Sequence, residues 1–426
     1  MKSTDISRQN QRLQRISPTT AVVGVDIGKF QHVAHVTDFR GLVLTRRPLS
    51  FTNTVVGFEN LVAHIRQVQR DHKLDHVIVG MESTGHYFWN LAYWLREHQL
   101  DVVIVNPMTT KRNKENRDNT PSKNDAKDAL VIADVVSRGY YTPFADETGV
   151  FVHLRLLVRN REHWIVDETR IKNRITRWVD IRFPEYRTVF DDLFGVRSLA
   201  TLRLFPAPSD LVGRTPDQLI ALWGPYMRRP GGQRGLRTAT QLLRQARQSV
   251  GLTVGLAEDR WELMQLLAAY DRLQDTLTEV DQRIESLMDQ VPYVAHVRSV
   301  GMPAPDTAAI VALAGDLRQY THGNQLLRKA GLNLAERRSG QSVGKVRISK
   351  RGNALLRKHL FHAVLYLIAQ HPTFQAWHTH NVQVKHIAPM QSVMKLMGKL
   401  ARILVAICQH DIGFEPNPGP NGKPAA

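Results

Sequence analysis

The stretch Ala21-Val-Val-Gly-Val-Asp26-Ile, at residues 21–27, decides the fold. It is short, apolar and rich in β-branched residues, as is typical of a buried strand. Between segments whose apolar residues have helical spacing, the chain has further strand-like runs at residues 31–37, 42–49, 76–81 and 101–105. The order βββαβαβα predicts an α/β domain with a mixed sheet over residues 19–148.

The rest of the chain is predicted to be mainly helical. Residues 1–18 are polar and lack a clear period, so a flexible arm is expected there. Residues 149–295 have a charged helical pattern, and the roughly heptad spacing of apolar residues in 261–288 predicts a coiled-coil hairpin or a dimer helix. Within this region, the stretch 206–247 is rich in proline, glycine and arginine and is expected to form a phosphate-facing insertion.

Three further segments complete the expected organisation. In the first domain, a polar loop at residues 107–123 is expected to lead into a helix at 124–138. A last compact unit, which ends in two apolar helices, is expected over residues 296–412. The tail, residues 413–426, is rich in proline and glycine and is predicted to be disordered. The fold class is therefore α/β plus all-α.

The composition favours nucleic acid as a partner. Lysine and arginine number 57 against 39 acidic residues, and a formal net charge of +18 points to a large anionic partner. The chain has no uninterrupted apolar run of about eighteen residues and no N-terminus of the signal type, so no membrane partner is expected. We expect a soluble, cytoplasmic protein that associates with the nucleoid when active. Its single cysteine, Cys408, excludes a disulfide framework and a cysteine-built zinc site.

Four acidic residues, two at strand ends and two at a helix start, are candidates for a metal site. Asp26 and Glu82 each end an apolar strand, where a charge is costly unless a cation or hydrogen bonds compensate for it. Asp125 and Asp128 are three residues apart at a helix start and therefore share one face. Because α/β sheets place their sites at the carboxyl ends of strands, these elements can converge.

Oxygen ligands without cysteine suit Mg²⁺, for which Mn²⁺ can substitute. Two such ions can clamp the attacking and leaving oxygens of a phosphodiester. Taken alone, Asp125 and Asp128 could simply favour a helix N-terminus, and Asp26 could be a turn or cap residue. The combination of four acids, in this order and on these elements, favours the metal site.

A basic segment between residues 321 and 360 contains Ser339 and Ser342 and is expected to contact phosphate. The residues alone leave two roles open for its serines. Their hydroxyls could hydrogen-bond a DNA backbone, or one could be a nucleophile, although the local sequence offers no base to activate it. The residues expected to bind nucleic acid are Lys123, Arg337, Arg338, Lys345, Arg347, Lys350 and Arg351.

Two sets of motifs resemble the DEDD transposases of the insertion-sequence "one-ten" family, which includes the bridge-RNA-guided recombinases. The first set is similar to that family's ribonuclease-H-like (RuvC-like) domain, and consists of Gly24-Val-Asp26-Ile-Gly-Lys, Glu82-Ser-Thr-Gly-His-Tyr, Val105-Asn-Pro and Lys123-Asn-Asp125-Ala-Lys-Asp128-Ala. The second set is similar to its serine-containing transposase domain, and consists of Ala330-Gly-Leu, Ser339-Gly and Ile348-Ser-Lys-Arg-Gly-Asn-Ala-Leu-Leu-Arg.

The resemblance implies a specific chemistry. The four acids would bind Mg²⁺, and Ser339 would attack a DNA phosphate to form a covalent phosphoserine intermediate, with Ser342 as the fallback position. The resemblance also implies a homo-oligomer, a dimer or tetramer, whose active sites combine residues of different protomers. Donor and target DNA would be the substrates, and a structured noncoding RNA would pair with both, so that base pairing carries the specificity.

Three other interpretations fit parts of the pattern. Sugar kinases and other actin-like ATPases share a strand like that of Asp26, but no second glycine-rich phosphate loop is present here. A junction nuclease resembling RuvC would need the acids and not Ser339. A non-enzymatic packaging or adaptor protein for nucleic acid would need only the positive charge.

Overall fold

The protein folds into two compact units, residues 1–146 and 147–426. The structure is a computed structural model. It describes residues 3–83, 85–117, 125–144, 149–335, 338–339, 342–343 and 347–415. The central region and the C-terminal region, which the sequence suggests as separate parts, therefore both lie in the second unit.

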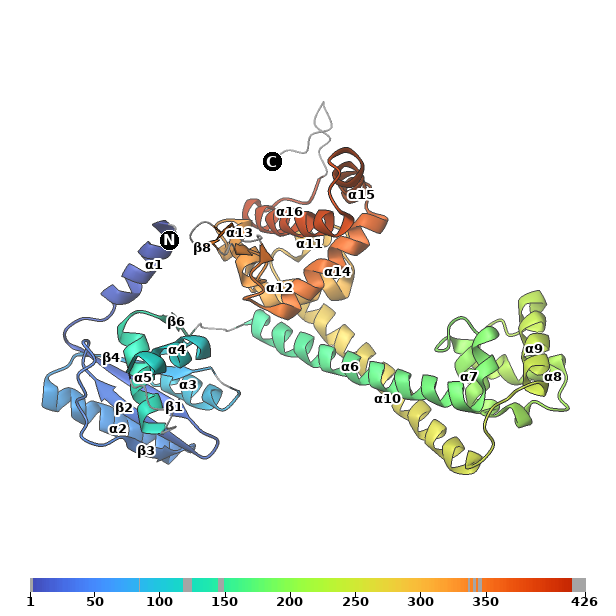
Figure 1. The fold of residues 1–426 in the computed structure, drawn as a ribbon, viewed down its shortest axis with the longest axis horizontal. Helices are drawn as coiled ribbons and strands as arrows, with labels where there is room; N and C mark the ends of the chain where they lie inside the picture. The colour runs from blue at the N-terminus through green and yellow to red at the C-terminus, as the bar shows by residue number, and fades with distance from the viewer. Residues whose placement is uncertain are drawn as a thin grey trace. The chain divides into compact units, whose positions relative to one another are not determined.

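The first unit is built on a six-stranded mixed sheet with the strand order β3-β2-β1-β4-β5-β6 (Figure 1). β1 pairs antiparallel with β2 and parallel with β4, and β4 pairs parallel with β5. This arrangement confirms the predicted α/β class. The strands are β1 (Thr20–Ile27), β2 (Gln31–Thr37), β3 (Leu49–Thr52), β4 (His76–Glu82), β5 (Asp101–Val105) and β6 (Tyr141–Pro143). The helices are α1 (Ser3–Gln14), α2 (Val55–His72), α3 (Phe88–Glu97), α4 (Pro107–Arg117) and α5 (Asp125–Ser137).

Helices cover both faces of this sheet. On one face, α2 and α3 bury residues such as Leu61 and Leu91 against the strands. On the other face, α5 packs through residues such as Ile132. Side chains alternate along a strand, so Val23 of β1 faces α2 and α3, whereas Val22 faces α5.

The N-terminal segment, expected as a flexible arm, contains helix α1 and is attached to the sheet domain. The Tyr141 hydroxyl donates a hydrogen bond of 2.9 Å to the carbonyl oxygen of Arg12. Arg15 forms an ion pair of 2.5 Å with Asp101, and Ile16 packs against the core beneath α5. The polar composition of residues 1–18 does not predict these contacts, because each contact involves a residue that is distant in the sequence.

The third strand begins later than expected. Asp38 Oδ1 accepts hydrogen bonds from the backbone N–H groups of Arg40 and Leu42, and these bonds turn the chain. The expected strand at 42–49 is reduced to one bridge between Thr37 and Val43, and β3 follows it.

The second unit is organised around an antiparallel pair of long helices, α6 (Val150–Arg182) and α10 (Leu256–Met288) (Figure 1). Each has 33 residues, which corresponds to about 50 Å at a rise of about 1.5 Å per residue. Ion pairs cross between the helices at both ends, from Arg161 to Asp281 and from Arg174 to Glu262. The apolar repeat of 261–288 therefore packs within the same chain, and a role in dimer formation stays a prediction.

A separate core forms at one end of the hairpin, which we call the tip core. It combines the end of α6 and the start of α10 with the helices between them. These are α7 (Val196–Leu204), α8 (Pro216–Trp223) and α9 (Gly232–Arg247), with 3₁₀ turns at Pro184–Thr188, Pro208–Asp210 and Gly224–Tyr226. The arginine-rich stretch 206–247 is thus mostly helical, with Trp223 and Leu242 fully buried. Arg214 is half-buried, whereas Arg228, Arg229, Arg234, Arg237, Arg244 and Arg247 are exposed, and their contact with phosphate stays a prediction.

The opposite end of the hairpin belongs to the C-terminal core. Leu154 of α6 and Ile284 of α10 are buried there among the C-terminal helices. These helices are α11 (Val294–Arg298), α12 (Ala304–Ala314), α13 (Gly323–Lys329), α14 (Ala354–Gln370), α15 (Pro372–Thr379) and α16 (Pro389–His410), with a 3₁₀ turn at Leu317–Gln319 and a π-helical turn at His380–Val384. The two apolar helices expected from the sequence are α14 and α16.

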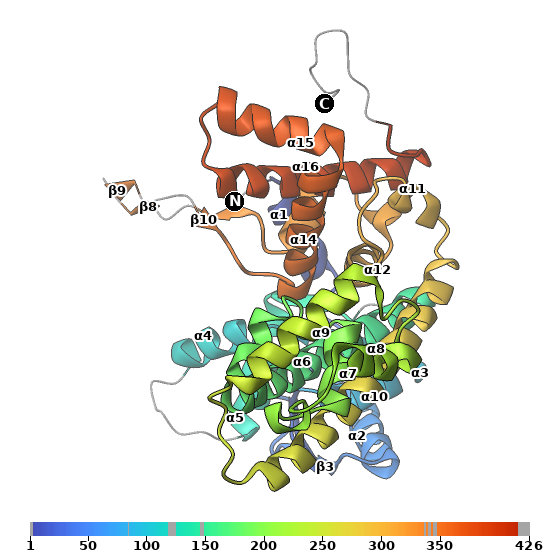
Figure 2. The same ribbon diagram turned by 90° about the vertical axis from the view of Figure 1, so that its right-hand side faces the viewer.

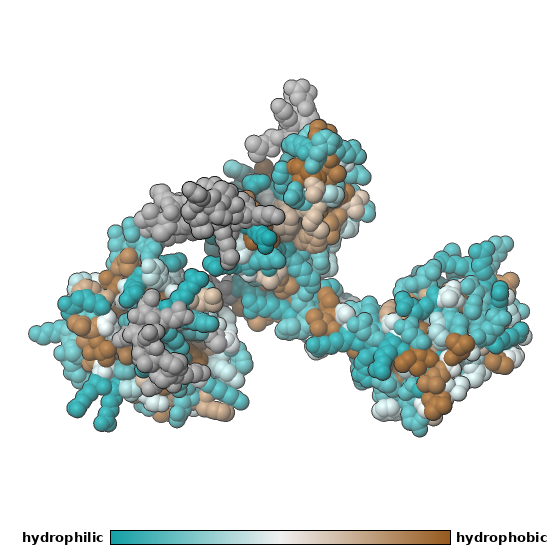
Figure 3. All heavy atoms as spheres, viewed as in Figure 1, coloured by the Kyte–Doolittle hydropathy of each residue, from teal (hydrophilic) through white to brown (hydrophobic). Residues whose placement is uncertain are grey.

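The surface seen in Figure 3 is largely hydrophilic, with scattered hydrophobic patches. Large apolar side chains are exposed where the chain enters α10, at Val250, Val254 and Trp261. Within the described part of the chain, no helix combines the length and the apolar character that crossing a lipid bilayer requires. The tail beyond residue 415, predicted to be disordered, lies outside the described residues.

Candidate functional site: four carboxylates and a serine hairpin

Strand geometry brings Asp26 and Glu82 to the same place. β1 and β4 are parallel neighbours, and Val25 is in register with Met81. Asp26 and Glu82 therefore occupy matching positions, one residue further along each strand. Because side chains alternate, both residues lie on the sheet face that α5 covers. Both side chains are half-buried.

Two glycines let α5 lie directly on that face. A Cβ atom at Gly24 would stand 2.0 Å from the carbonyl oxygen of Ala129, and one at Gly80 would stand 2.4 Å from a methyl group of Val136. Only residues without a side chain allow so close an approach of helix and strand. The glycines at these positions thus place the start of α5 beside the ends of β1 and β4.

The start of α5 carries Asp125 and Asp128, and both act on Asp26. Burial is the largest of the influences that raise the pKa of Asp26 from 3.8 to about 6. The charges of Asp128 and Asp125 come next in raising this pKa. Lys114 opposes them, and Glu82 adds a smaller increase. The structure therefore brings the four predicted acids into one electrostatic neighbourhood.

This neighbourhood has the donor set that a hard divalent cation prefers. Carboxylate oxygens dominate it, and the raised pKa of Asp26 marks negative charge that the protein leaves only partly compensated. Among the described residues, no three of these acids offer one oxygen each within 4.8 Å of one another, so the acids are neighbours and not a closed ligand cage.

Helix α4 adds residues that the sequence did not single out. The Thr110 hydroxyl donates a hydrogen bond of 2.7 Å to Glu82 Oε2. Lys114 Nζ forms an ion pair of 2.5 Å with Asp128 Oδ1, and Arg138, which directly follows α5, donates to Asn113 Oδ1 at 3.4 Å. Thr110 thus orients one predicted ligand, and Lys114 offsets the charge of another.

The sequence contains one signal for this helix. Asn106 precedes Pro107, and an asparagine N-cap followed by proline at the first helical position is a common helix start. Asn106 Oδ1 accepts a hydrogen bond of 2.9 Å from the backbone N–H of Met108. The expected loop at 107–123 is wrong for residues 107–117, and Lys123 lies outside the described residues.

The serine segment of the second unit forms two small antiparallel pairs of strands. β7 (Leu334–Ala335) pairs with β10 (Arg347–Ile348), and β8 (Arg338–Ser339) pairs with β9 (Ser342–Val343). Figure 2 shows β8 and β9 beyond β10, away from the helices. Ser339 stands in register with Ser342, and only the backbone of these strands is described.

We call residues 334–348, with their two strand pairs, the serine hairpin. Two of the C-terminal motifs, Ala330-Gly-Leu and Ile348-Ser-Lys-Arg-Gly-Asn-Ala-Leu-Leu-Arg, meet at its base. A Cβ atom at Gly352 would stand 2.3 Å from the backbone nitrogen of Gly331, so the two motifs touch through their glycines. Gly331 has φ +70°, a conformation that favours glycine. Ser349 Oγ donates to Asn333 Oδ1 at 2.6 Å, and the Asn353 side chain caps α14 by accepting from the N–H of Leu356. These contacts hold the two ends of the serine segment together.

The predicted nucleic-acid ligands of this segment are only partly described. Arg347, Lys350 and Arg351 are exposed beside the hairpin base. Arg338 is described through its backbone, and Arg337 and Lys345 lie outside the described residues. Their contacts with nucleic acid stay predictions.

Two family models match separate parts of the chain. A family model for DEDD transposases of IS110, described as "Transposase", matches residues 23–184. A second, described as "Transposase IS116/IS110/IS902 family", matches residues 301–379. The first match contains the four acids, and the second contains the serine hairpin.

Curated relatives agree with these matches. The mini-circle putative transposase for IS117 of Streptomyces coelicolor is 22% identical over 334 residues, which cover 76% of this chain and 78% of the relative. The pilin gene-inverting protein of Moraxella lacunata is 26% identical over 144 residues, 33% of this chain and 42% of the relative. That of Moraxella bovis is 28% identical over 114 residues, 27% of this chain and 34% of the relative. The matches in both units, together with these relatives, show that the chain belongs to the IS116/IS110/IS902 family of transposases and is a DNA transposase or recombinase.

Proposed function

We propose that this transposase cuts and rejoins DNA strands through metal-assisted attack of Ser339 on phosphodiesters, and that a noncoding RNA selects the sites. The observation that carries the proposal is the convergence of Asp125, Asp128 and Glu82 on the half-buried Asp26, whose pKa rises to about 6. Such a group of acids, in a chain that also carries a basic serine segment, suits chemistry on phosphate.

The four acids would hold Mg²⁺, with Mn²⁺ as a substitute. Bound there, the ion would neutralise charge on the phosphate and lower the pKa of a hydroxyl at its surface. Thr110 keeps Glu82 in place, and Lys114 pairs with Asp128. These residues thus set the positions and the net charge of the acids before substrate binds.

The serine would form the covalent intermediate. A bond forms between Ser339 Oγ and phosphorus, the bond from phosphorus to one deoxyribose oxygen breaks, and that oxygen leaves as a hydroxyl after taking up a proton. In the second step, a hydroxyl of the other strand attacks the phosphoserine and releases the serine. One phosphodiester is lost and one is gained, so no nucleotide cofactor is consumed.

The acids and the serine belong to different units of the chain, and we propose that they meet between protomers of an oligomer. Each active site would then take the acids from one protomer and Ser339 from another. The net charge of +18 supports binding of donor DNA, target DNA and the guide RNA together. The similarity to pilin gene-inverting proteins suggests inversion as one outcome, when two sites lie in opposite orientation on one DNA.

Trapping of a protein–DNA adduct tests the serine. The protein is incubated with Mg²⁺, the DNA that flanks its gene and the noncoding transcript of that DNA, and adducts are resolved on a denaturing gel. We expect an adduct with the wild type and with Ser342→Ala, which is matched because Ser342 pairs with Ser339 across the same strands. Ser339→Ala and Asp125→Asn should each abolish it. Cleavage that persists in Ser339→Ala would instead support the alternative, a RuvC-like nuclease without covalent serine chemistry.

Mixing of two inactive variants tests the composite site. Asp125→Asn supplies an intact serine, and Ser339→Ala supplies intact acids. If the halves come from different protomers, mixed oligomers regain part of the strand transfer that each variant lacks. Mixtures that stay inactive, although the subunits exchange, would show that each site is completed within one protomer.

A further inference from the structure

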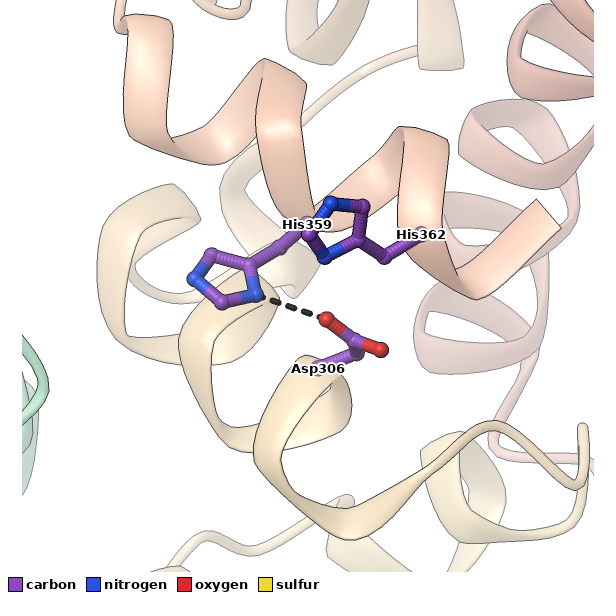
Figure 4. A group of neighbouring side chains, drawn as sticks. All are labelled: Asp306, His359 and His362. Carbon is purple, nitrogen blue, oxygen red and sulfur yellow. Dashed lines mark hydrogen bonds and ion pairs between the residues drawn. The ribbon is translucent and has the colours of Figure 1, made fainter. Parts of the chain in front are cut away.

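A second group of metal-binding side chains lies in the second unit, outside the proposed catalytic residues. Asp306 of α12 and the two histidines of α14, His359 and His362, each offer one ligand atom, and the three atoms lie within 4.8 Å of one another (Figure 4). We infer that these residues bind one divalent transition-metal ion, for which Zn²⁺ is the best fit.

Helix geometry explains the arrangement of the ligands. His359 and His362 are three residues apart on α14, so both project from the same side of the helix. α12 packs against α14 in the C-terminal core. Asp306 lies in the first turn of α12, and its Oδ1 is 2.7 Å from His359 Nδ1. Figure 4 shows the Asp306 carboxylate facing the His359 ring, with the His362 ring beside this pair.

The surroundings of His359 resemble those of a metal-bound histidine. Its second nitrogen, Nε2, lies 3.0 Å from Glu162 Oε1 of α6. The other carboxylate oxygen of Glu162 is held at 2.6 Å by Lys358 Nζ. Metal-ligating histidines commonly donate their remaining N–H to a carboxylate, which fixes the tautomer and the orientation of the ring. If Nε2–H is directed at Glu162 and the Nδ1 proton is lost, the Nδ1 lone pair would be free to bind an ion held between it and Asp306.

The exposure of the three side chains also fits a metal site. Asp306 and His359 are 9% and 5% exposed, whereas His362 is exposed. Two ligands are therefore fixed by the core, and the third can adjust at the surface, where an ion enters. Three protein ligands leave a fourth position of a tetrahedral zinc ion for water.

The ligand types select the metal. Two imidazole nitrogens and one carboxylate oxygen suit Zn²⁺ and neighbouring transition metals, whereas Mg²⁺ prefers oxygen alone. Bonds of about 2.1 Å place the ligands of a tetrahedral ion roughly 3.4 Å apart. Asp306 and His359 would have to separate slightly to reach that distance, and a surface rotation of His362 can close the site. An ion there would join α12 and α14 directly and, through Glu162, α6.

The competing explanation is a metal-free ion network, in which His359 is protonated and bridges Asp306 and Glu162. Titration with Co²⁺, whose visible absorption reports nitrogen ligands and coordination number, distinguishes the two. The full-length chain is stripped with chelator and carries Asp125→Asn, so that the carboxylate site of the first unit contributes less. We expect saturation at one Co²⁺ per chain, displacement by Zn²⁺ and no displacement by Mg²⁺.

Variants complete the test. His362→Ala changes an exposed residue and should abolish the Co²⁺ signal, and Asp306→Asn should do the same. Glu162→Gln should weaken binding by about 10–100-fold, as loss of a residue behind a metal-bound histidine does. His410→Ala removes another exposed histidine, at the end of α16, and should change nothing. An Asp125→Asn protein that does not saturate at one Co²⁺ per chain, or an unchanged affinity when His362→Ala is added to it, overturns the inference.

Discussion

Asp26 is the residue at which strand geometry, burial and charge meet. The alternation of β1 turns it toward α5, and Gly24, two residues earlier, lets α5 come close enough to present Asp125 and Asp128. Asp125 and Asp128 are distant from Asp26 in the sequence, so they raise its pKa only because the fold brings them close. The electrostatic character of the site therefore depends on one small residue as much as on the acids themselves.

Replacement of Asp26 by asparagine should stabilise the metal-free protein at neutral pH. The pKa of Asp26 is about 6 in the folded state against 3.8 for an ordinary aspartate, so its contribution to stability is complete below pH 3.8 and is lost as the pH rises through 6. At pH 7.5 we expect Asp26→Asn to be more stable by about 1–2 kcal/mol, after a discount for solvent screening.

Urea unfolding from pH 4 to pH 8, without divalent ions, measures this difference. It should grow with pH, and added Mg²⁺ should stabilise the wild type more than the variant. If the difference in the free energy of unfolding does not change with pH, the ionised form of Asp26 is not disfavoured by the fold.

A methyl group at position 24 should disturb both the fold and the site. In Gly24→Ala the new Cβ atom would stand 2.0 Å from the Ala129 carbonyl oxygen, which α5 can relieve only by moving away. Overpacking of this kind costs about 1–3 kcal/mol. Gly224→Ala is the control, because a Cβ atom there meets nothing within 4 Å. We expect denaturant unfolding to show the loss only in Gly24→Ala, with reduced strand transfer, and equal stability of the two variants would argue against the close packing.

At the scale of elements, the sequence predicts those helices and strands that have a clear pattern of apolar residues. β1, β2, β4 and β5 were found because their residues are buried on one or both faces, and α14 and α16 because they are long and apolar. α4 was missed because it has no apolar stripe, and its buried residues include the polar Thr110 and Asn113.

The candidate sites follow the same rule. The proximity of the four acids could be predicted, since each stands at the end of a recognisable element, whereas their role in binding metal stays a prediction. Lys114 could not, because its partner Asp128 is reached only through the packing of α4 on α5. Asp306 and His359 are separated by 53 positions, and nothing in the local pattern of either residue points to the other.

The exposed basic residues at the hairpin base should set part of the salt dependence of DNA binding. Each phosphate contact contributes about −0.9 to the slope of log K against log salt concentration. If Arg347, Lys350 and Arg351 each contact one phosphate, their combined replacement by alanine should reduce the slope by about 2.7. Fluorescence anisotropy over a series of salt concentrations gives the slope.

A charge-matched control separates local contact from overall charge. Replacement of the exposed Arg46, Arg47 and Arg66 of the first unit by alanine removes the same charge. We expect this variant to keep the wild-type slope. Equal losses in the two variants would mean that net charge, and not the hairpin base, governs binding.

At the scale of the whole molecule, the chain forms two packing units, and the candidate site residues are shared out between them. The first unit carries the acids, and the second carries the serine hairpin, the histidine cluster and the helical hairpin. The two units have cores of their own on either side of residue 146, so each can respond to its own ligand.

Calorimetry should therefore resolve more than one unfolding transition, because separate cores rarely unfold as one two-state system. Mg²⁺ should raise the transition of the first unit, and Zn²⁺ should raise that of the second, since a ligand stabilises only the fold that binds it. Asp26→Asn and His362→Ala assign the transitions by removing one response each. A single transition that shifts with both ions would contradict this independence.

The paired helices α6 and α10 also make the protein divisible. The polypeptide leaves the C-terminal core along one helix and returns along the other, so residues 183–255, together with the adjoining ends of α6 and α10, form one lobe that two neighbouring helices connect to the rest of the unit. Trimming both helices at facing levels and bridging them with a short loop would give a smaller recombinase. A foreign binding domain could be joined to the same two helices, with no change to the sequence of the carboxylate site or of the serine hairpin.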